Sequence, residues 1–190
     1  MNEALEEIGR VSGEGGPLLL TDLITVTSWR GIEEGGKDYE RACDLLGEGP
    51  GTEGCAIAIG RETGVVWEIE GGGTAGVFRR GQDYAIVTRI WPEDPDDTRT
   101  FRVLAEVAAA DIVRIAELSI ASGVLAILWA PEDGRAFESL DPAGLPMGEM
   151  SMGGTGLTLE LAPGVYDCFH DAVSNAAGDA RRCHLVRRAG

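Results

Sequence analysis

The sequence has no long apolar run, and its first residues lack the pattern of a secretion signal. A membrane-spanning helix needs about 20 consecutive apolar residues, and charged residues interrupt every long apolar stretch of the 190-residue chain. Residues 1–10 are acidic and contain neither a basic start nor an apolar core. We therefore expect a cytoplasmic protein without a membrane partner.

Cysteine is scarce, with four residues that lie far apart in the sequence. Disulfides are rare in the reducing cytoplasm, and unpaired cysteine is among the residue types most often buried. We expect all four to be free, buried and structural: Cys43, Cys55, Cys168 and Cys183.

Positive charge is also scarce, because 16 Lys and Arg oppose 32 Asp and Glu and leave a net charge of −16. Such a field repels phosphate backbones and anionic lipids, so we expect no nucleic-acid partner. Two explanations of the charge stay open at this point. It can serve solubility alone, or it can speed association with a basic protein.

Short strand-like segments separated by glycine-bearing turns dominate the sequence. Apolar runs and alternations predict strands at 17–20, 55–59, 65–69, 84–90, 124–129, 157–161, 165–170 and 183–186, with residues 23–26 continuing or following the first. We predict the α+β class: a single domain with a mainly antiparallel β-sheet, one main helix and short helical turns. Residues 1–14 are expected to form a leading helix or a loose tail before the domain at 15–190.

The main helix is predicted at about 98–110, where one face carries Leu104, Val107 and Ala108. A short helical segment is expected at 38–46, with Asp38 as its N-cap. Residues 112–120 fit either an extension of the main helix or a strand. We choose the strand, because residues 122–123 then form a hairpin turn into the next one.

The glycine-rich segment 71–76 has the spacing G-x-G-x-x-G after a predicted strand. In dinucleotide-binding folds, such glycines let a pyrophosphate approach the start of a helix. Here residues 77–81 do not begin an amphipathic helix, so we predict a hairpin turn and no cofactor.

The two histidines, His170 and His184, lie near Cys168 and Cys183, and such residues bind zinc in many proteins. On strands, Cys168 and His170 share a face, whereas the adjacent Cys183 and His184 face opposite sides. At most three ligands converge, so we predict no metal and a cross-strand cluster of thiols and rings. A small metal- or ligand-binding enzyme built on Cys168, His170 and Cys183 stays as an alternative.

Surface recognition is the remaining function class, because no catalytic motif stands out. We expect tryptophans to pack in the core, with Trp91 as an exception since it leads into an acidic, proline-containing loop. A second acidic loop spans 131–156. The predicted partner-binding residues are the tryptophan and the acidic side chains of these two loops: Trp91, Glu93, Asp94, Asp96, Asp97, Glu132, Asp133, Glu138 and Asp141.

Three ordered motifs give the first third of the chain a resemblance to a known family. They are GGPLL at 15–19, WRG at 29–31 and DYERAC at 38–43. In this order they resemble the Immunity protein 21 family of bacterial polymorphic toxin systems. The motif residues, expected to be structural, are Gly16, Pro17, Trp29, Gly31, Asp38, Tyr39, Arg41 and Cys43.

The resemblance implies a cytoplasmic antidote that binds a cognate protein toxin and performs no chemistry. Such inhibitors occlude a toxin's active site or substrate channel, and many target toxins are basic nucleases. An acidic inhibitor can imitate nucleic acid electrostatically, which would make binding fast and salt-sensitive. A generic acidic interaction module is the other alternative.

Overall fold

The computed structural model describes residues 4–35, 37–47, 53–67, 73–89, 98–108, 111–139, 150 and 153–189. They form one domain with two antiparallel sheets, which confirms the predicted mainly-β α+β class. In sheet order, the six-stranded sheet consists of β1 (Glu6–Ser12), β5 (Thr74–Arg80), β6 (Asp83–Arg89), β11 (Gly178–Arg187), β10 (Gly164–Asn175) and β7 (Val113–Ile120). The five-stranded sheet consists of β3 (Gly54–Ile59), β4 (Glu62–Trp67), β2 (Leu18–Asp22), β8 (Val124–Trp129) and β9 (Gly156–Glu160).

The two sheets face each other across the largest apolar core. Alternate residues of the strands other than β3 point into it, including Leu18, Trp67, Val77, Ile86 and Leu185. All five are completely buried. This core gives each sheet one inner face, and it leaves each sheet an outer face that must also be covered.

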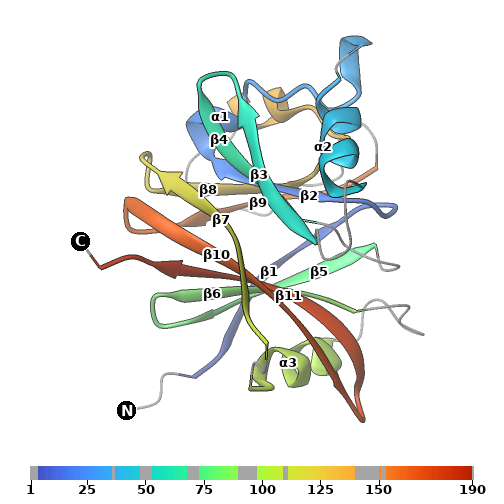
Figure 1. Cartoon of the computed structure of the whole chain (residues 1–190), viewed down its shortest axis with the longest axis vertical. Coiled ribbons are helices and arrows are strands. Elements are labelled where there is room, and N and C mark those ends of the chain that lie inside the picture. The colour runs from blue at the N-terminus through green and yellow to red at the C-terminus, as the bar shows by residue number, and fades with distance from the viewer. Residues whose placement is uncertain are drawn as a thin grey trace.

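Helical segments cover both outer faces, so the molecule has four layers (Figure 1). The five-stranded sheet is covered by α1 (Leu23–Val26), α2 (Asp38–Gly47) and the 3₁₀ helix η2 (Gly134–Ser139), which bury a second core. With the 3₁₀ helix η1 (Glu33–Gly35), we call residues 22–35, 37–47 and 130–139 the helical cap. At the opposite end, α3 (Thr98–Glu106) covers the six-stranded sheet.

The predicted helices are confirmed, with α3 ending a few residues early and α2 covering the expected segment. Strands at 113–120 and 156–160 and the final hairpin of β10 and β11 also agree with the sequence. Residues 23–26 differ, because they form the short helix α1. Asp22 begins this helix, and its Oδ1 accepts a hydrogen bond from the Ile24 N–H at 2.8 Å.

Two predicted hairpin turns are wrong, because the chain crosses between the sheets there. The turn at 122–123 follows β7, which pairs with β10, and precedes β8, which pairs with β2 and β9. The segment 71–76 likewise leads from β4 to β5, which lie in different sheets. Its residues 74–76 are the start of β5, so this part is strand and not turn.

The predicted leading helix or tail is also wrong, since β1 is a strand at the edge of the six-stranded sheet. It pairs antiparallel with β5 and buries Val11 completely. An ion pair joins Glu6 to Arg79 at 2.6 Å. The Glu and Ala content of the segment favours a helix, but the open edge of β5 and the inter-sheet core favour a strand. No helix of the described residues is long and apolar enough to cross a membrane.

Candidate functional site

The WRG motif forms a turn that lies against residues 130–134, far along the chain. Trp29 is completely buried, and its Nε1 donates to the Ala130 carbonyl oxygen at 2.8 Å. The backbone adds two hydrogen bonds, from Ile32 N to Pro131 O at 3.1 Å and from Gly134 N to Trp29 O at 3.0 Å. These contacts hold the two halves of the helical cap together.

Gly31 is the point of closest approach in this contact. Its φ is +56°, and a Cβ built there would lie 2.1 Å from the Pro131 carbonyl oxygen. No larger residue fits at that distance, and the positive φ is itself unfavourable for other residues. The motif therefore needs glycine here for backbone packing.

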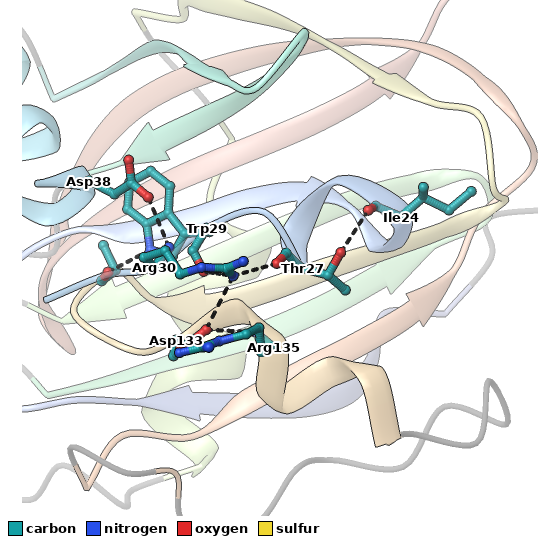
Figure 2. A network of polar contacts seen from close by, with 8 residues as sticks. Ile24, Thr27, Trp29, Arg30, Asp38, Asp133 and Arg135 are labelled. Atoms are coloured by element: carbon teal, nitrogen blue, oxygen red, sulfur yellow. Dashed lines mark hydrogen bonds and ion pairs between the residues drawn. The ribbon is translucent and has the colours of Figure 1, made fainter. Parts of the chain in front are cut away.

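A polar network surrounds the same contact (Figure 2). The Arg30 N–H donates to Asp38 Oδ2 at 2.9 Å, and the Arg30 guanidinium donates to the Thr27 carbonyl oxygen at 2.6 Å. The same guanidinium lies 3.7 Å from Asp133 Oδ1, and Asp133 also accepts hydrogen bonds from Arg135. Burial raises the pKa of Asp133, but the Arg135 hydrogen bonds outweigh it, so this pKa lies below its usual value.

Four motif residues line a small depression of about 190 Å³ beside α2: Gly16, Pro17, Tyr39 and Cys43. Leu46 and Gly47 complete its lining. Burial, and then the neighbouring Cys43 thiol, raise the pKa of Tyr39. Arg41 points to the other side of the helix, where it pairs with Asp38 at 3.1 Å and donates to the Ala58 carbonyl oxygen at 2.7 Å. Six of the eight motif residues thus belong to the helical cap, and the other two, Gly16 and Pro17, lie beside α2 just before β2.

Of the two predicted acidic loops, only part of the second is described, and there the acidic residues are less exposed than the sequence suggests. Glu132 is completely buried, and its Oε1 accepts a hydrogen bond from the Gly154 N–H at 2.8 Å, so it is a structural residue and not a surface contact. The Asp133 side chain is only 13% exposed and is committed to two arginines. Glu138 is exposed. The other predicted contact residues lie outside the described residues: Trp91, Glu93, Asp94, Asp96, Asp97 and Asp141.

The predicted burial of the tryptophans and cysteines is confirmed for some of these residues and wrong for others. Trp29, Trp67 and Trp129 are buried as expected. All four cysteines are free, but Cys43 is exposed and Cys55 is only half-buried, so the expectation of burial is wrong for these two.

The candidate metal cluster lies inside the inter-sheet core. Cys183 is the register partner of His170, and Cys168 and Cys183 are completely buried. Burial raises the pKa of Cys168 to about 12 and that of Cys183 well above its usual value, so both thiols are protonated at neutral pH. The Trp67 Nε1 donates to His170 Nδ1 at 3.2 Å, and burial lowers the His170 pKa. The described residues contain no group of His, Cys, Asp and Glu able to hold a metal ion.

A charged cluster on the outer face of the same two strands was not predicted. Asp171 and Arg182 are register partners on β10 and β11, and their side chains are 0% and 1% exposed. Arg182 donates to both carboxylate oxygens, with Nε at 2.8 Å from Oδ1. Arg182 Nη1 also donates to the carbonyl oxygens of Leu104 at 3.1 Å and Val107 at 2.6 Å, at the end of α3. This arginine therefore fastens α3 to the sheet.

His184 completes the cluster, because its Nε2 lies 3.0 Å from Asp171 Oδ1. Burial alone would raise the pKa of Asp171, but hydrogen bonds from Arg182 and His184 outweigh it and hold this pKa well below its usual value. The sequence does contain a signal for the pair. The hairpin pairs Asn175 with Gly178, and counting back along both strands places Asp171 opposite Arg182.

No family model, curated protein or solved structure matches the chain. The resemblance to the Immunity protein 21 family therefore rests on the three motifs and stays a prediction.

Replacing Gly31 by alanine should destabilise the domain strongly, because the new Cβ would collide with the Pro131 carbonyl oxygen. Gly35→Ala is the matched control, since Gly35 also has a positive φ, +69°, but a Cβ added there would have no atom within 4 Å. We expect the control to lose about 1 kcal/mol of unfolding free energy in urea from the backbone alone, and Gly31→Ala to lose clearly more. Equal losses would contradict the close contact.

Replacing Arg182 by methionine should cost about 3–5 kcal/mol of unfolding free energy, because it leaves the Asp171 carboxylate buried without a partner. The double variant Asp171→Leu/Arg182→Met should lose less than Arg182→Met alone. A loss below about 1 kcal/mol for the single variant would contradict a buried ion pair.

The same pair predicts the response of stability to acid. Because the folded-state pKa of Asp171 is lowered, its contribution is complete above the ordinary carboxyl pKa of about 4 and is lost as pH falls further. Urea unfolding of the wild type and Asp171→Asn between neutral and acidic pH checks this sign. The variant should be less stable at neutral pH and should lose less on acidification.

Proposed function

We propose that the chain is an immunity protein, a cytoplasmic antidote that binds a cognate basic toxin and neutralises it by protein–protein occlusion. The motif resemblance suggests this role, and a basic nuclease is the toxin class that fits the charge best. The observation that carries the proposal is the uncompensated negative charge of the helical cap, whose two halves are joined by the contacts around Gly31.

The helical cap contains nine acidic and four basic side chains. Glu40, Asp44 and Glu138 are exposed, and none of the three forms an ion pair with another described residue. A basic partner can therefore meet these carboxylates without first breaking an internal pair. Such complementarity chiefly increases the rate of association and the selectivity for the partner.

Most arginines of the chain are already committed to other carboxylates and do not neutralise Glu40, Asp44 and Glu138. Ten arginines already form ion pairs with acidic side chains of the described residues: Arg10, Arg30, Arg41, Arg79, Arg102, Arg114, Arg135, Arg181, Arg182 and Arg188. The excess negative charge therefore resides in carboxylates without a counter-charge, and those on the cap are grouped at one end of the molecule.

The depression beside α2 supplies the second feature of a binding surface. It is lined by Pro17, Tyr39 and Leu46, and the helix α2 that supplies the last two also carries the exposed carboxylates of Glu40 and Asp44. Binding energy in protein interfaces concentrates where a side chain enters such a pocket, and a charged rim surrounds it. A basic or aromatic side chain of the toxin would fit this arrangement.

The metal- or ligand-binding enzyme built on Cys168, His170 and Cys183 is the weaker candidate. These residues lie within the inter-sheet core, and their thiols are held in the protonated form that binds metals poorly. Cys168 and Cys183 are completely buried and His170 is nearly so, and we therefore do not propose this activity.

Association with the toxin should be fast and salt-sensitive, and it should depend on α2. We expect the product of the adjacent gene to co-purify with the chain. Glu40→Gln/Asp44→Asn should lower its association rate roughly three- to tenfold at low salt, with a smaller effect at high salt.

The matched control is Glu62→Gln/Glu160→Gln, which removes two exposed carboxylates from the strands. It should leave the rate close to that of the wild type. Absence of any complex, or a rate independent of salt and of both pairs of substitutions, would contradict the proposal.

A further inference from the structure

A second hollow lies at the opposite end of the molecule from the helical cap, between α3 and the outer face of the six-stranded sheet. Its volume is about 370 Å³, which lies within the range of small-molecule sites. Apolar side chains form much of its wall, among them Leu5, Phe78 and Val107. Its polar lining consists of Arg80, Asp83, Glu106, Arg182 and His184.

Asp171 fixes the orientation of His184 in this pocket. The ionised carboxylate can only accept hydrogen bonds, so His184 Nε2 must carry the proton that it shares with Asp171 Oδ1. In the neutral ring, Nδ1 is then an acceptor, and no partner within the described residues occupies it. The His184 side chain is 21% exposed and lines the pocket.

The fold does not require this histidine for charge balance. Arg182 already neutralises Asp171 and binds both of its oxygens, and it also satisfies two carbonyls at the end of α3. His184 adds a hydrogen-bond acceptor, Nδ1, at the pocket wall, and the buried Asp171 carboxylate holds the ring in its orientation. This arrangement of a positioned ring and a supporting acid is typical of ligand sites.

Two opposite charges lie side by side at the same pocket. Arg80 and Asp83 are register partners at the turn between β5 and β6, and both are exposed. They form no ion pair with each other or with another described residue. Glu106, which lies 3.8 Å from Arg102, adds a second carboxylate to the lining. The pocket therefore offers one available guanidinium, two carboxylates and the His184 acceptor around an apolar wall.

We propose that this pocket binds a small zwitterion with an apolar side chain, that is, a free apolar α-amino acid. Arg80 receives its carboxylate, and Asp83, Glu106 and His184 Nδ1 receive its ammonium group. The apolar side chain packs on Ala105 and Val107, which are partly exposed at the pocket wall. The neighbouring opposite charges of Arg80 and Asp83 match a ligand whose two charges are attached to a single carbon atom.

Imidazole NMR of the full chain with L-leucine as the probe tests this proposal. The chain has two histidines, and His170 faces the inter-sheet core, so it serves as an internal reference. We expect L-leucine to move the His184 ring signals saturably at about millimolar concentration while His170 stays unchanged.

Three matched probes remove one feature each: N-acetyl-leucine lacks the ammonium group, leucinamide lacks the carboxylate, and glycine lacks the apolar side chain. Each should bind at least about tenfold more weakly than L-leucine. Arg80→Gln should abolish the response, whereas the control Arg61→Gln, at the exposed turn between β3 and β4, should retain it.

Three results would overturn the proposal. They are the absence of a saturable His184 shift up to about 10 mM L-leucine, an equal response to any of the three matched probes, and an unchanged response in Arg80→Gln. The result is independent of the toxin, because the pocket and the helical cap lie at opposite ends of the molecule.

Discussion

The helical cap depends on one backbone contact, in which the turn at Gly31 lies directly on the Pro131–Glu132 segment. Around it, the Trp29 indole and two backbone hydrogen bonds fix two segments that are far apart in the sequence. Their acidic residues consequently lie at one end of the molecule. Without this contact, the outer face of the five-stranded sheet would lose its cover, and α2 would lose its position relative to η2.

The two ends of the molecule differ in charge and in what holds them. The helical cap has an excess of carboxylates and is joined to the sheet mainly by apolar packing. At the other end, α3 carries Arg99 and Arg102 against Glu106 and is fastened through the buried Arg182. This division gives the protein two separate surfaces, and we propose a basic protein as the partner of one and a small dipolar ligand for the other.

Much of the fold could be predicted from local patterns. Strand alternation identified β9 and the hairpin of β10 and β11, and the apolar spacing identified α3. The assignment of strands to sheets could not be predicted, because the turn at 122–123 has the same local signal whether the chain returns in one sheet or crosses to another. The strand β1 could not be predicted, because its backbone hydrogen bonds are made with β5, which lies far away in the sequence.

The residues of the candidate functional site were likewise only partly predictable from local sequence patterns. Glu132 belongs to an acidic run, which suggests exposure, yet it is completely buried and accepts a hydrogen bond from the Gly154 backbone N–H, a partner that the sequence does not reveal. The sequence shows the order of the motif residues but not their contacts. Only the fold reveals that Gly16 lies against Tyr39 and Gly31 against Pro131. The pair Asp171 and Arg182 was within reach of sequence reasoning, since the hairpin turn sets its register.

Hydrogen exchange of the complex with the adjacent gene product tests the central claim that the helical cap is the toxin-binding face. We predict that binding slows amide exchange in α2 and η2 while α3 and the strand β11 stay unchanged. Protection confined to α3 and the six-stranded sheet, or no protection at the cap, would contradict the account.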